Sequence, residues 1–536
     1  MITNDLCLIY PPLSVHEFPH MALPLLKGFV KKNGYNKIVI KDFNVEIMGD
    51  IIDSRLDRIE AYFAQNGIKI TIAEIRKNID LAKNVLLDTN KQGKDEWAFM
   101  IINTYLKIAG SDISEVCFSP ACFDDIKQNF YRKTKGEYED TITKAIERDL
   151  VQYLTNNPAG VVGITIPFGS QIYYALIMGR LIKRNFPNIK VIMGGAQVSM
   201  FWRILTEHKP FHEAFDALVY GNGELAILGY LDHVTQSKDI RDVPNLIYIN
   251  IYGKVCKNDE KNIGHIRELP IPDFSDLPLE KYAYPKLPYM MTRGCYWGKC
   301  AFCSYRETKG YMARDVDNII SDIEEMKSKY KRRLFHFIDD AIHPNLINKV
   351  AERLINQNMN IKYETYLRFD RLFDEKMCIH LSKSGLRSAL FGLESANSRI
   401  LKLMNKGIHL DDVRFVLKNM KSANVKPVLS CLIGFPTETR EEAMESVNFL
   451  LDNKQQYDQA FLVHYGLISD MYLDKEYYGL KSIDFDNPIR YDDSGYLALG
   501  YKYQTSRGMT VEEAFDVIDY GRKALGIKQF KDSFFS

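Results

Sequence analysis

The 536-residue sequence lacks features that would assign it to a membrane, a secreted or a nucleic-acid-binding class. It contains no run of about eighteen apolar residues, so no membrane-spanning helix is expected. The first residues, Met1–Asp5, lack the basic start of a signal peptide, which favours a cytoplasmic location. The 70 basic and 69 acidic side chains nearly balance, so no global attraction to nucleic acid or to an anionic membrane is expected.

Disulfide bonds are not expected either, because thiols stay reduced in the cytoplasm. Six of the nine cysteines are scattered, and we expect them to be small buried apolar residues: Cys7, Cys117, Cys122, Cys256, Cys378 and Cys431. The other three, Cys295, Cys300 and Cys303, lie close together. Structural zinc sites and ferredoxin-type cluster sites normally have four protein ligands. Three thiols therefore predict a metal site with one open coordination position.

The first part of the chain predicts a doubly wound parallel sheet, because strand patterns alternate with helix patterns. Residues from about 45 to 158 carry helical periodicity instead, which predicts a helical insertion. We expect this first domain to span residues 1–240. Ligands of such sheets bind beyond the carboxyl ends of the strands. The candidate residues at those ends are Pro12, Asp42, Gly194, Gly195, Gly221, Gly223 and Glu224.

A linker is expected at residues 241–280, with a hairpin around Tyr252 and Gly253 and then a proline-spaced tether. Beyond it, six apolar strand patterns, each followed by a helix pattern, predict a partial β/α barrel over residues 281–480. Active residues of barrels lie at the carboxyl ends of the strands. Those ends hold the cysteine loop, Asp339, Asp340, Arg368, Glu394, Ser395, Gly434, Pro436 and Tyr465. Residues 481–536 predict a small α+β segment.

These motifs together resemble the cobalamin-dependent branch of the radical S-adenosylmethionine (SAM) enzymes. The order of loops in the first domain, Pro-Pro, Asp, Gly-Gly and Gly-x-Gly-Glu, is similar to that of their cobalamin-binding domain. The cysteines here are spaced C-x4-C-x2-C, one residue longer than the family's usual C-x3-C-x2-C. No Asp-x-His-x-x-Gly occurs, so a lower axial histidine of the methionine-synthase kind is not expected.

The resemblance implies three cofactors and a set of residues for each. It implies a [4Fe-4S] cluster on Cys295, Cys300 and Cys303. It implies contacts to SAM from Phe302, Asp339, Asp340, Arg368, Glu394, Ser395, Gly434 and Pro436. It implies contacts to cobalamin from Pro12, Asp42, Gly194, Gly195, Gly221, Gly223 and Glu224.

Simpler roles stay open for several of these residues. Asp340 and Glu394 could each be only a helix N-cap. Arg368 could pair with the carboxylate of SAM, or form a salt bridge with Asp370 or a neighbouring acid. Tyr465 is a candidate catalytic residue facing the substrate, and a core tyrosine is the alternative. His16 and His20, near the Pro-Pro loop, could approach the lower face of a corrinoid or be solvated.

The function that the resemblance implies is methyl transfer from methylcobalamin to an unactivated carbon of a natural-product, peptide or lipid substrate. The expected partners are a small-molecule or peptide substrate and a reductant such as flavodoxin or ferredoxin. Two alternatives stay open: a cyclase or rearrangement enzyme that does not methylate, and a non-catalytic corrinoid or iron–sulfur sensor. A methylthiotransferase is not expected, because it would need three further cysteines in its N-terminal domain.

Overall fold

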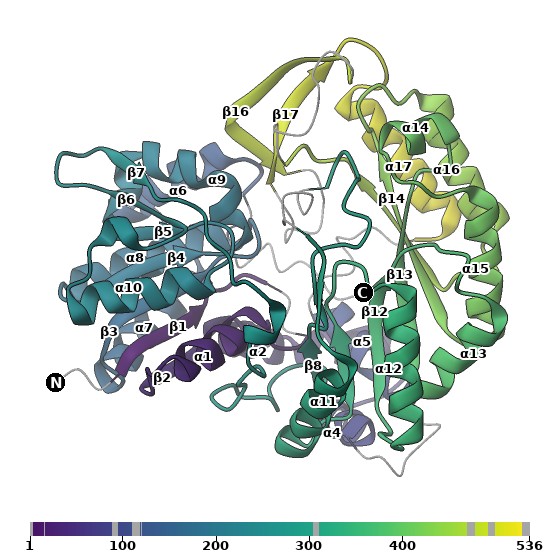
Figure 1. Cartoon of the computed structure of the whole chain (residues 1–536), viewed down its shortest axis with the longest axis horizontal. Coiled ribbons are helices and arrows are strands. Elements are labelled where there is room, and N and C mark those ends of the chain that lie inside the picture. The colour runs from purple at the N-terminus through teal and green to yellow at the C-terminus, as the bar shows by residue number, and fades with distance from the viewer. Residues whose placement is uncertain are drawn as a thin grey trace.

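The structure is a computed structural model that describes residues 4–14, 17–87, 95–109, 118, 120–303, 310–468, 478–490 and 499–527. It is an α/β protein with two large sheets, as predicted. The two sheets and their helices form two units that lie side by side, with the last two strands at the top and the last helix packed against the barrel unit (Figure 1). Among the described residues, no helix combines the length and the apolar character that a membrane span requires.

The first sheet has seven strands in the order β2-β1-β3-β4-β5-β6-β7. Its five parallel strands are β1 (Asn4–Tyr10), β2 (Ile38–Asp42), β3 (Ala159–Thr165), β4 (Lys190–Gly194) and β5 (Ala217–Val219). Around them lie α1 (Ala22–Lys32), α8 (Gln171–Asn185), α9 (Ala196–Glu207) and α10 (Glu224–Gln236). The strand order reverses between β1 and β3, the point at which ligands of doubly wound sheets bind.

The hairpin expected inside the linker belongs to this sheet. Its strands β6 (Leu246–Ile249) and β7 (Val255–Lys257) continue the sheet antiparallel from β5. The backbone groups on the free edge of β5 need partners, and the hairpin supplies them.

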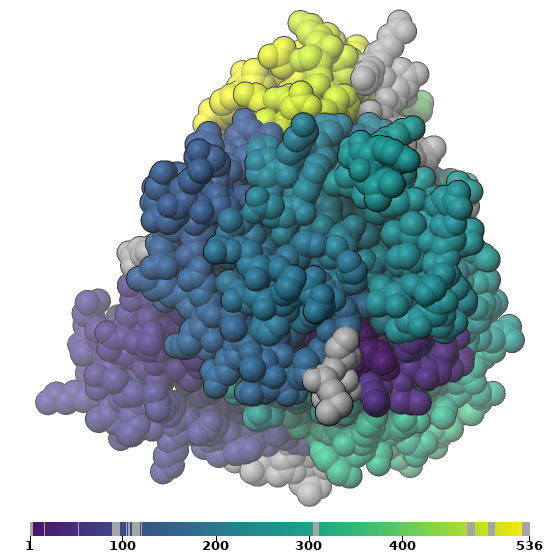
Figure 2. Space-filling model, turned by 90° about the vertical axis from the view of Figure 1, so that its left-hand side faces the viewer, coloured from purple at the N-terminus to yellow at the C-terminus, as the bar shows by residue number. Residues whose placement is uncertain are grey.

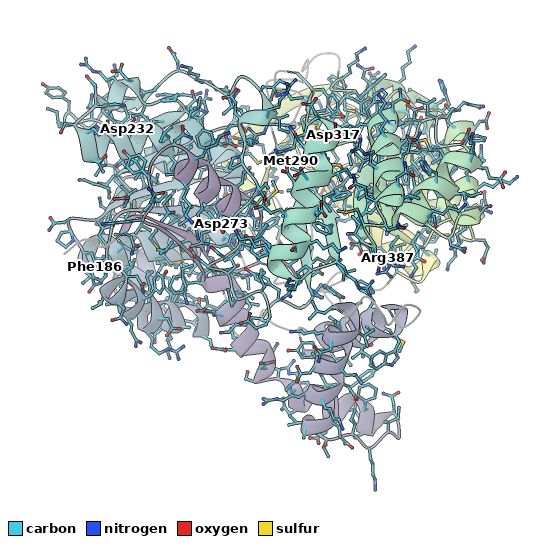
Figure 3. The ribbon with its side chains drawn as sticks, turned by 60° about the horizontal axis from the view of Figure 1, so that its bottom comes forward. Phe186, Asp232, Asp273, Met290, Asp317 and Arg387 are labelled. Atoms are coloured by element: carbon cyan, nitrogen blue, oxygen red, sulfur yellow. The ribbon has the colours of Figure 1, made fainter. Side chains whose placement is uncertain are left out.

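In the described part of the stretch between β2 and β3, where a helical insertion was predicted, the structure has six helices. They are α2 (Phe43–Asp53), α3 (Leu56–Gln65), α4 (Ile72–Leu87), α5 (Asp95–Ala109), α6 (Phe123–Thr134) and α7 (Thr141–Asn156). Helices α6 and α7 share a core with α8. In contrast, α3, α4 and α5 form a separate core that includes Tyr284 and Leu334 near the start of the barrel strands. These helices project below the rest of the molecule (Figure 3).

The second sheet has six parallel strands in the order β15-β14-β13-β12-β11-β8, and it confirms the partial barrel. Its strands are β8 (Lys286–Tyr289), β11 (Leu334–Phe337), β12 (Lys362–Leu367), β13 (Leu386–Glu394), β14 (Lys426–Ile433) and β15 (Gln459–His464). Its helices are α11 (Val316–Tyr330), α12 (Pro344–Asn356), α13 (Glu375–Ser384), α14 (Ser398–Leu403), α15 (Leu410–Ser422) and α16 (Arg440–Asp452). Beside the cysteine loop, the short strands β9 (Thr292–Arg293) and β10 (Met312–Ala313) pair antiparallel.

The C-terminal hairpin contacts both units. It consists of β16 (Leu480–Arg490) and β17 (Leu499–Thr505), and α17 (Val511–Leu525) follows it. Arg490 N–H donates to the carbonyl of Ala121 in the first unit, and Tyr503 Oη donates to the carbonyl of Gly434 in the barrel. In the space-filling view from the side of the first unit, this segment covers the top of the molecule (Figure 2).

Buried polar contacts fasten the first unit to the segment that leads into the barrel. Lys27 Nζ lies 2.6 Å from an oxygen of Asp276 and 3.6 Å from one of Asp273. Asp42 is buried, and its two oxygens accept hydrogen bonds from Val45 N–H and from Tyr282 Oη, at 2.8 and 2.7 Å. The predicted cobalamin contact of Asp42 therefore competes with a structural role.

Removal of the Tyr282 hydroxyl tests that role. Tyr282→Phe leaves one oxygen of the buried Asp42 carboxyl without its donor, so we expect a loss of about 1–3 kcal/mol in the free energy of unfolding. Urea denaturation measures it. Tyr252→Phe, in the exposed hairpin turn, is the control and should change nothing. Equal stability of Tyr282→Phe and the wild type would contradict the role.

Candidate functional site

A cavity of about 780 Å³ lies between the carboxyl ends of the two sheets. From the first unit it is lined by Gly194, Gly195, Gly221, Gly223 and Glu224, among others. From the barrel it is lined by Cys295, Cys300, Phe302, Cys303, Asp339, Asp340, Arg368 and Glu394. The structure thus brings together, on one cavity, residues that the sequence assigned to three cofactors. Met290, at the end of β8, lies between the two units (Figure 3).

The cysteine loop is fastened to the turn that follows α14. Ala301 N–H donates to the carbonyl of Met404 at 2.8 Å, and Trp297 Nε1 donates to the carbonyl of Asn405 at 2.9 Å. Burial raises the pKa of the Cys300 thiol, and the nearby cations Lys406 and Arg368 oppose that rise. Cations beside a thiol favour the thiolate, which is the form that binds metal.

The three thiols are soft sulfur donors, a set that suits an iron–sulfur cluster. Within the described ranges, no three metal-binding side chains converge on one point as the ligands of a lone ion would. In an iron–sulfur cluster the thiolates bind different irons and stand further apart. The loop supplies three sulfur ligands beside an open cavity, which leaves room for a further ligand that is not protein.

Asp339 ties the start of the cysteine loop to the end of β11. Its Oδ1 accepts hydrogen bonds from Thr292 N–H and Thr292 Oγ1, at 2.5 and 2.7 Å. Its Oδ2 has no hydrogen-bond partner among the described residues, although the side chain is buried and lines the cavity. Burial raises the pKa of this carboxyl to about 7. Asp340 lines the cavity next to it.

Glu394 and Lys406 form an ion pair on the cavity wall. Lys406 Nζ lies 2.8 Å from Glu394 Oε1, and both side chains are about one-tenth exposed. Glu394 has a positive φ of 63°, a strained backbone for a residue with a side chain. A Cβ at Gly392 would lie 2.0 Å from Glu394 Oε1, so glycine at this position makes room for the pair.

Arg368 clamps two loops together. Its guanidinium stacks on the Trp297 ring at 4.2 Å, and Nη2 donates to the carbonyls of Lys406 and Gly407. The salt bridge with Asp370 that the sequence left open does not form among the described residues. Arg368 still lines the cavity, with its Nη2 held by the two carbonyls.

The two units meet directly at Arg293 and Glu224. Arg293 Nη2 lies 2.5 Å from Glu224 Oε1, and the two side chains are 12% and 5% exposed. Glu224 ends the Gly-x-Gly-Glu loop, and Arg293 stands two residues before Cys295. Sequence reasoning missed Arg293, although its place immediately before Gly294 and Cys295 marked it as part of the cysteine motif.

Six predicted site residues are absent from the described cavity lining: Pro12, Asp42, Ser395, Gly434, Pro436 and Tyr465. Ser395 is fully buried and lies 3.3 Å from the hydroxyl of Ser446 on α16. Tyr465 packs against the rings of Phe435 and Tyr503, with centroids 5.0 and 6.0 Å away. It is therefore a core tyrosine, the alternative to a catalytic residue that the sequence left open.

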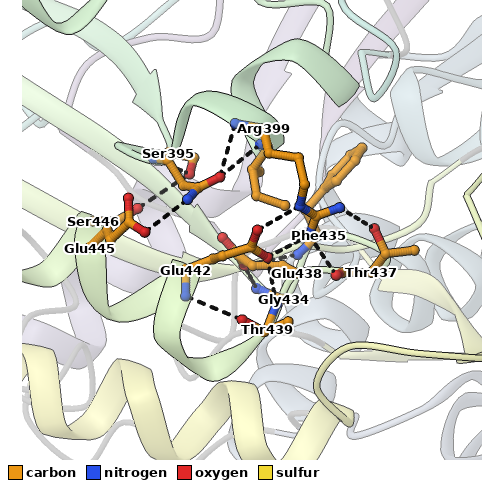
Figure 4. A network of polar contacts seen from close by, with 12 residues as sticks. Ser395, Arg399, Gly434, Phe435, Thr437, Glu438, Thr439, Glu442, Glu445 and Ser446 are labelled. Atoms are coloured by element: carbon orange, nitrogen blue, oxygen red, sulfur yellow. Dashed lines mark hydrogen bonds and ion pairs between the residues drawn. The ribbon is translucent and has the colours of Figure 1, made fainter.

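The Gly434-Phe435-Pro436 turn is held from within. Glu438 Oε2 accepts hydrogen bonds from the N–H groups of Gly434 and Phe435, at 2.6 and 3.3 Å. Arg399 on α14 binds Thr437 and Glu442, and so fastens the same loop to α16 (Figure 4). Glu438 is fully buried, and burial raises its pKa to about 8.

His20 lines the cavity, whereas His16 lies outside the described residues. The His20 ring stacks on Tyr10, and its Nδ1 accepts a hydrogen bond from Ala22 N–H. Burial lowers the pKa of His20 to about 4, so the ring is neutral at neutral pH. A neutral ring whose Nδ1 is an acceptor carries its proton on Nε2, and that nitrogen then has no lone pair for cobalt.

Comparison with known proteins identifies the barrel. Residues 289–450 match the family described as the radical SAM superfamily. The chain carries a radical SAM domain. An uncharacterized methyltransferase of Pyrococcus horikoshii is 28% identical over 309 residues, which are 56% of this chain and 66% of that protein. The chain thus covers less than two thirds of this relative.

Solved structures extend the likeness beyond the radical SAM domain. The cobalamin-dependent SAM radical enzyme OxsB, solved with aqua-cobalamin and SAM, gives a TM-score of 0.58 at 14% identity, over 89% of this chain and 55% of OxsB. The radical SAM methyltransferase TsrM from Kitasatospora setae, solved with cobalamin and a [4Fe-4S] cluster, gives 0.54 at 14% identity, over 86% of this chain and 75% of TsrM. At this identity the likeness establishes the fold: both units are arranged as in OxsB and TsrM.

The buried Glu438 predicts a pH dependence of stability. Its pKa is raised from 4.5 to about 8, so the folded protein keeps this proton to a higher pH than the unfolded chain does. Its contribution to stability is therefore fully present below pH 4.5 and is lost as the pH rises to about 8. Glu438→Gln, which stays neutral, should flatten this decline in urea denaturation between pH 5 and 8.5. The exposed neighbour Glu441→Gln should keep it, and an unchanged slope in Glu438→Gln would contradict the assignment.

Proposed function

We propose that the protein is a cobalamin-dependent radical SAM enzyme that transfers a methyl group from methylcobalamin to an unactivated carbon. One observation carries the proposal. A single cavity joins a three-thiol loop at the end of β8 to the glycine-rich strand ends of a doubly wound sheet. Both cofactor sites then face one volume, which methyl transfer between them requires.

Cys295, Cys300 and Cys303 would hold the cluster, and Asp339 and Glu394 would face the amino group of SAM. When bound, the cluster and SAM supply one-electron cleavage of the sulfonium. The chain's own residues bind and orient. Asp339 offers an unpartnered carboxyl oxygen in a buried site, and the Glu394–Lys406 pair fixes a second carboxylate.

An apolar slot under the strand ends supports the corrinoid. The cavity continues past Gly194 between one face of the first sheet and helices α1 and α10, along Leu8, Gly163, Ile192, Val219, Leu23 and Ile227. A Cβ at Gly163 would lie 3.0 Å from Leu8 Cδ2, so glycine keeps the slot open. A flat apolar group, such as the base on the nucleotide tail of cobalamin, fits such a slot.

Filling the slot should remove the corrinoid and spare the cluster. Gly163→Leu places a side chain beside Leu8, in the space where the base would bury its apolar surface. We therefore expect corrinoid affinity to fall at least about tenfold. The measurement is the corrin absorbance that remains after hydroxocobalamin loading and gel filtration, with iron content as the internal reference. Gly49→Leu, whose Cβ would meet nothing within 4 Å, is the matched control. Full corrin retention in Gly163→Leu would rule out the slot.

Asp339 predicts how SAM binding depends on pH. Its pKa of about 7 means that it gains its charge as the pH rises through neutrality, and only the charged form pairs well with an ammonium group. SAM affinity should therefore rise between pH 6 and 8. Asp339→Asn should bind SAM about tenfold more weakly and without this pH dependence, whereas Asp370→Asn should behave as wild type. Equilibrium dialysis on cluster-loaded protein measures the SAM affinity. If the SAM affinity of Asp339→Asn depended on pH as that of the wild type does, Asp339 would not pair with the amino group.

Methyl transfer itself has a test that needs no substrate. Anaerobically reconstituted protein, with its corrinoid reduced, should convert SAM to S-adenosylhomocysteine as methylcobalamin forms. Absence of S-adenosylhomocysteine, with 5′-deoxyadenosine still formed under dithionite, would favour a cyclase or rearrangement enzyme. Absence of both products would favour a sensor.

Four further expectations stay predictions. They are a reductant such as flavodoxin or ferredoxin, a cytoplasmic location, the lack of a nucleic-acid partner, and the division of the chain at residues 240, 280 and 480.

A further inference from the structure

Among the residues that the structure describes, three cationic side chains line the cavity around the cysteine loop: Arg293, Arg368 and Lys406. Two of them are engaged by the protein. Lys406 pairs with Glu394, and the Arg368 guanidinium stacks on Trp297 and donates to two backbone carbonyls. Lys406 would have to give up this ion pair to bind an anion, and Nη2 of Arg368 is fixed on its two carbonyls.

Arg293 has one arm held and the other open. Nη2 is bound to Glu224, but Nη1 is buried and has no hydrogen-bond partner among the described residues. A buried guanidinium nitrogen without an acceptor costs free energy, so the site is built for an acceptor that arrives with a ligand. The backbone of Arg293 is fixed by the pairing of β9 with β10, so the side chain leaves from a rigid position.

We propose that Arg293 binds the carboxylate of SAM and that Glu224 positions Arg293 for it. The inference rests on the proposed function and names a residue of the same site. Both terminal nitrogens of a guanidinium carry N–H donors, so Nη2 holds the protein carboxylate while Nη1 meets the carboxylate of the ligand. Asp339, held by the adjacent Thr292, offers an unpartnered oxygen. Two neighbours on β9 thereby serve the two charged groups of SAM: Arg293 binds the carboxylate, and Thr292 holds Asp339 toward the amino group.

This assignment changes the role of Glu224. The sequence placed it among the cobalamin contacts, whereas its carboxylate is bound to Arg293 in the cavity wall. Glu224 would then be a positioning residue for SAM that is supplied by the other unit. The SAM site would be incomplete without the first unit.

A ligand without the carboxylate tests the proposal. Full-length protein with its cluster reconstituted is dialysed anaerobically against SAM and against decarboxylated SAM. We expect Arg293→Gln to bind SAM at least about tenfold more weakly and decarboxylated SAM as the wild type does. Arg293→Lys should recover part of the preference for SAM, and Glu224→Gln should lose part of it. The electron paramagnetic resonance shift of the reduced cluster on SAM addition gives an independent readout. Arg371→Gln, at an exposed arginine paired with Asp412, is the control.

Equal SAM affinity in Arg293→Gln and the wild type, or an equal loss for both ligands, would overturn the proposal. So would a loss of hydroxocobalamin absorbance with SAM binding retained, because Arg293 would then serve the corrinoid. Iron content and circular dichroism check that the variants fold. If Arg293→Gln does not fold, Arg293→Lys and Glu224→Gln are compared with the wild type by the ratio of their affinities for SAM and for decarboxylated SAM. An unchanged ratio in both variants would overturn the proposal. If the wild type assembles a cluster but binds no SAM, the proposed function fails together with this inference.

Discussion

Parallel strands deliver all their following loops to one edge of the sheet, and this constraint determines what the molecule can do. Here two parallel sheets face each other with those edges, so the loops of both units border one cavity. A cluster site and a doubly wound ligand site that are separate in the sequence become neighbours. The Arg293–Glu224 ion pair crosses the junction next to the cysteine loop and ties the two edges together.

Much of the polar chemistry around the cavity serves to hold loops in place. The Arg368 guanidinium stacks on Trp297 and donates to backbone carbonyls, and Glu438 accepts a hydrogen bond from the backbone of the Gly434 turn. Arg399 joins that turn to α16. Such contacts fix the positions of the side chains that remain directed at the cavity. Asp339 and Arg293, two described residues that keep an unpartnered polar atom there, carry the charges that a charged ligand can meet.

The sequence predicted the two sheets because the alternation of apolar strands with helices is a local signal. It predicted the cysteine loop, Asp339, Arg368 and Glu394 at the cavity because the ends of parallel strands share one edge. It could not decide which of two successive strand-end residues faces inward, since side chains alternate sides. Glu394 faces the cavity, whereas Ser395, the next residue, is buried against Ser446.

Contacts between distant segments were also out of reach. The partner of Asp42 is Tyr282, 240 residues away, and nothing local to Asp42 indicates it. The pairing of β6 with β5 likewise depends on a free edge that exists only in the folded sheet.

The proposed function requires that the two cofactor sites border one volume. Electron paramagnetic resonance of protein holding both the reduced cluster and cob(II)alamin tests it most directly. We expect two spins in one molecule that broaden each other's signals; two unperturbed signals, or no protein-bound cob(II)alamin, would contradict a shared volume.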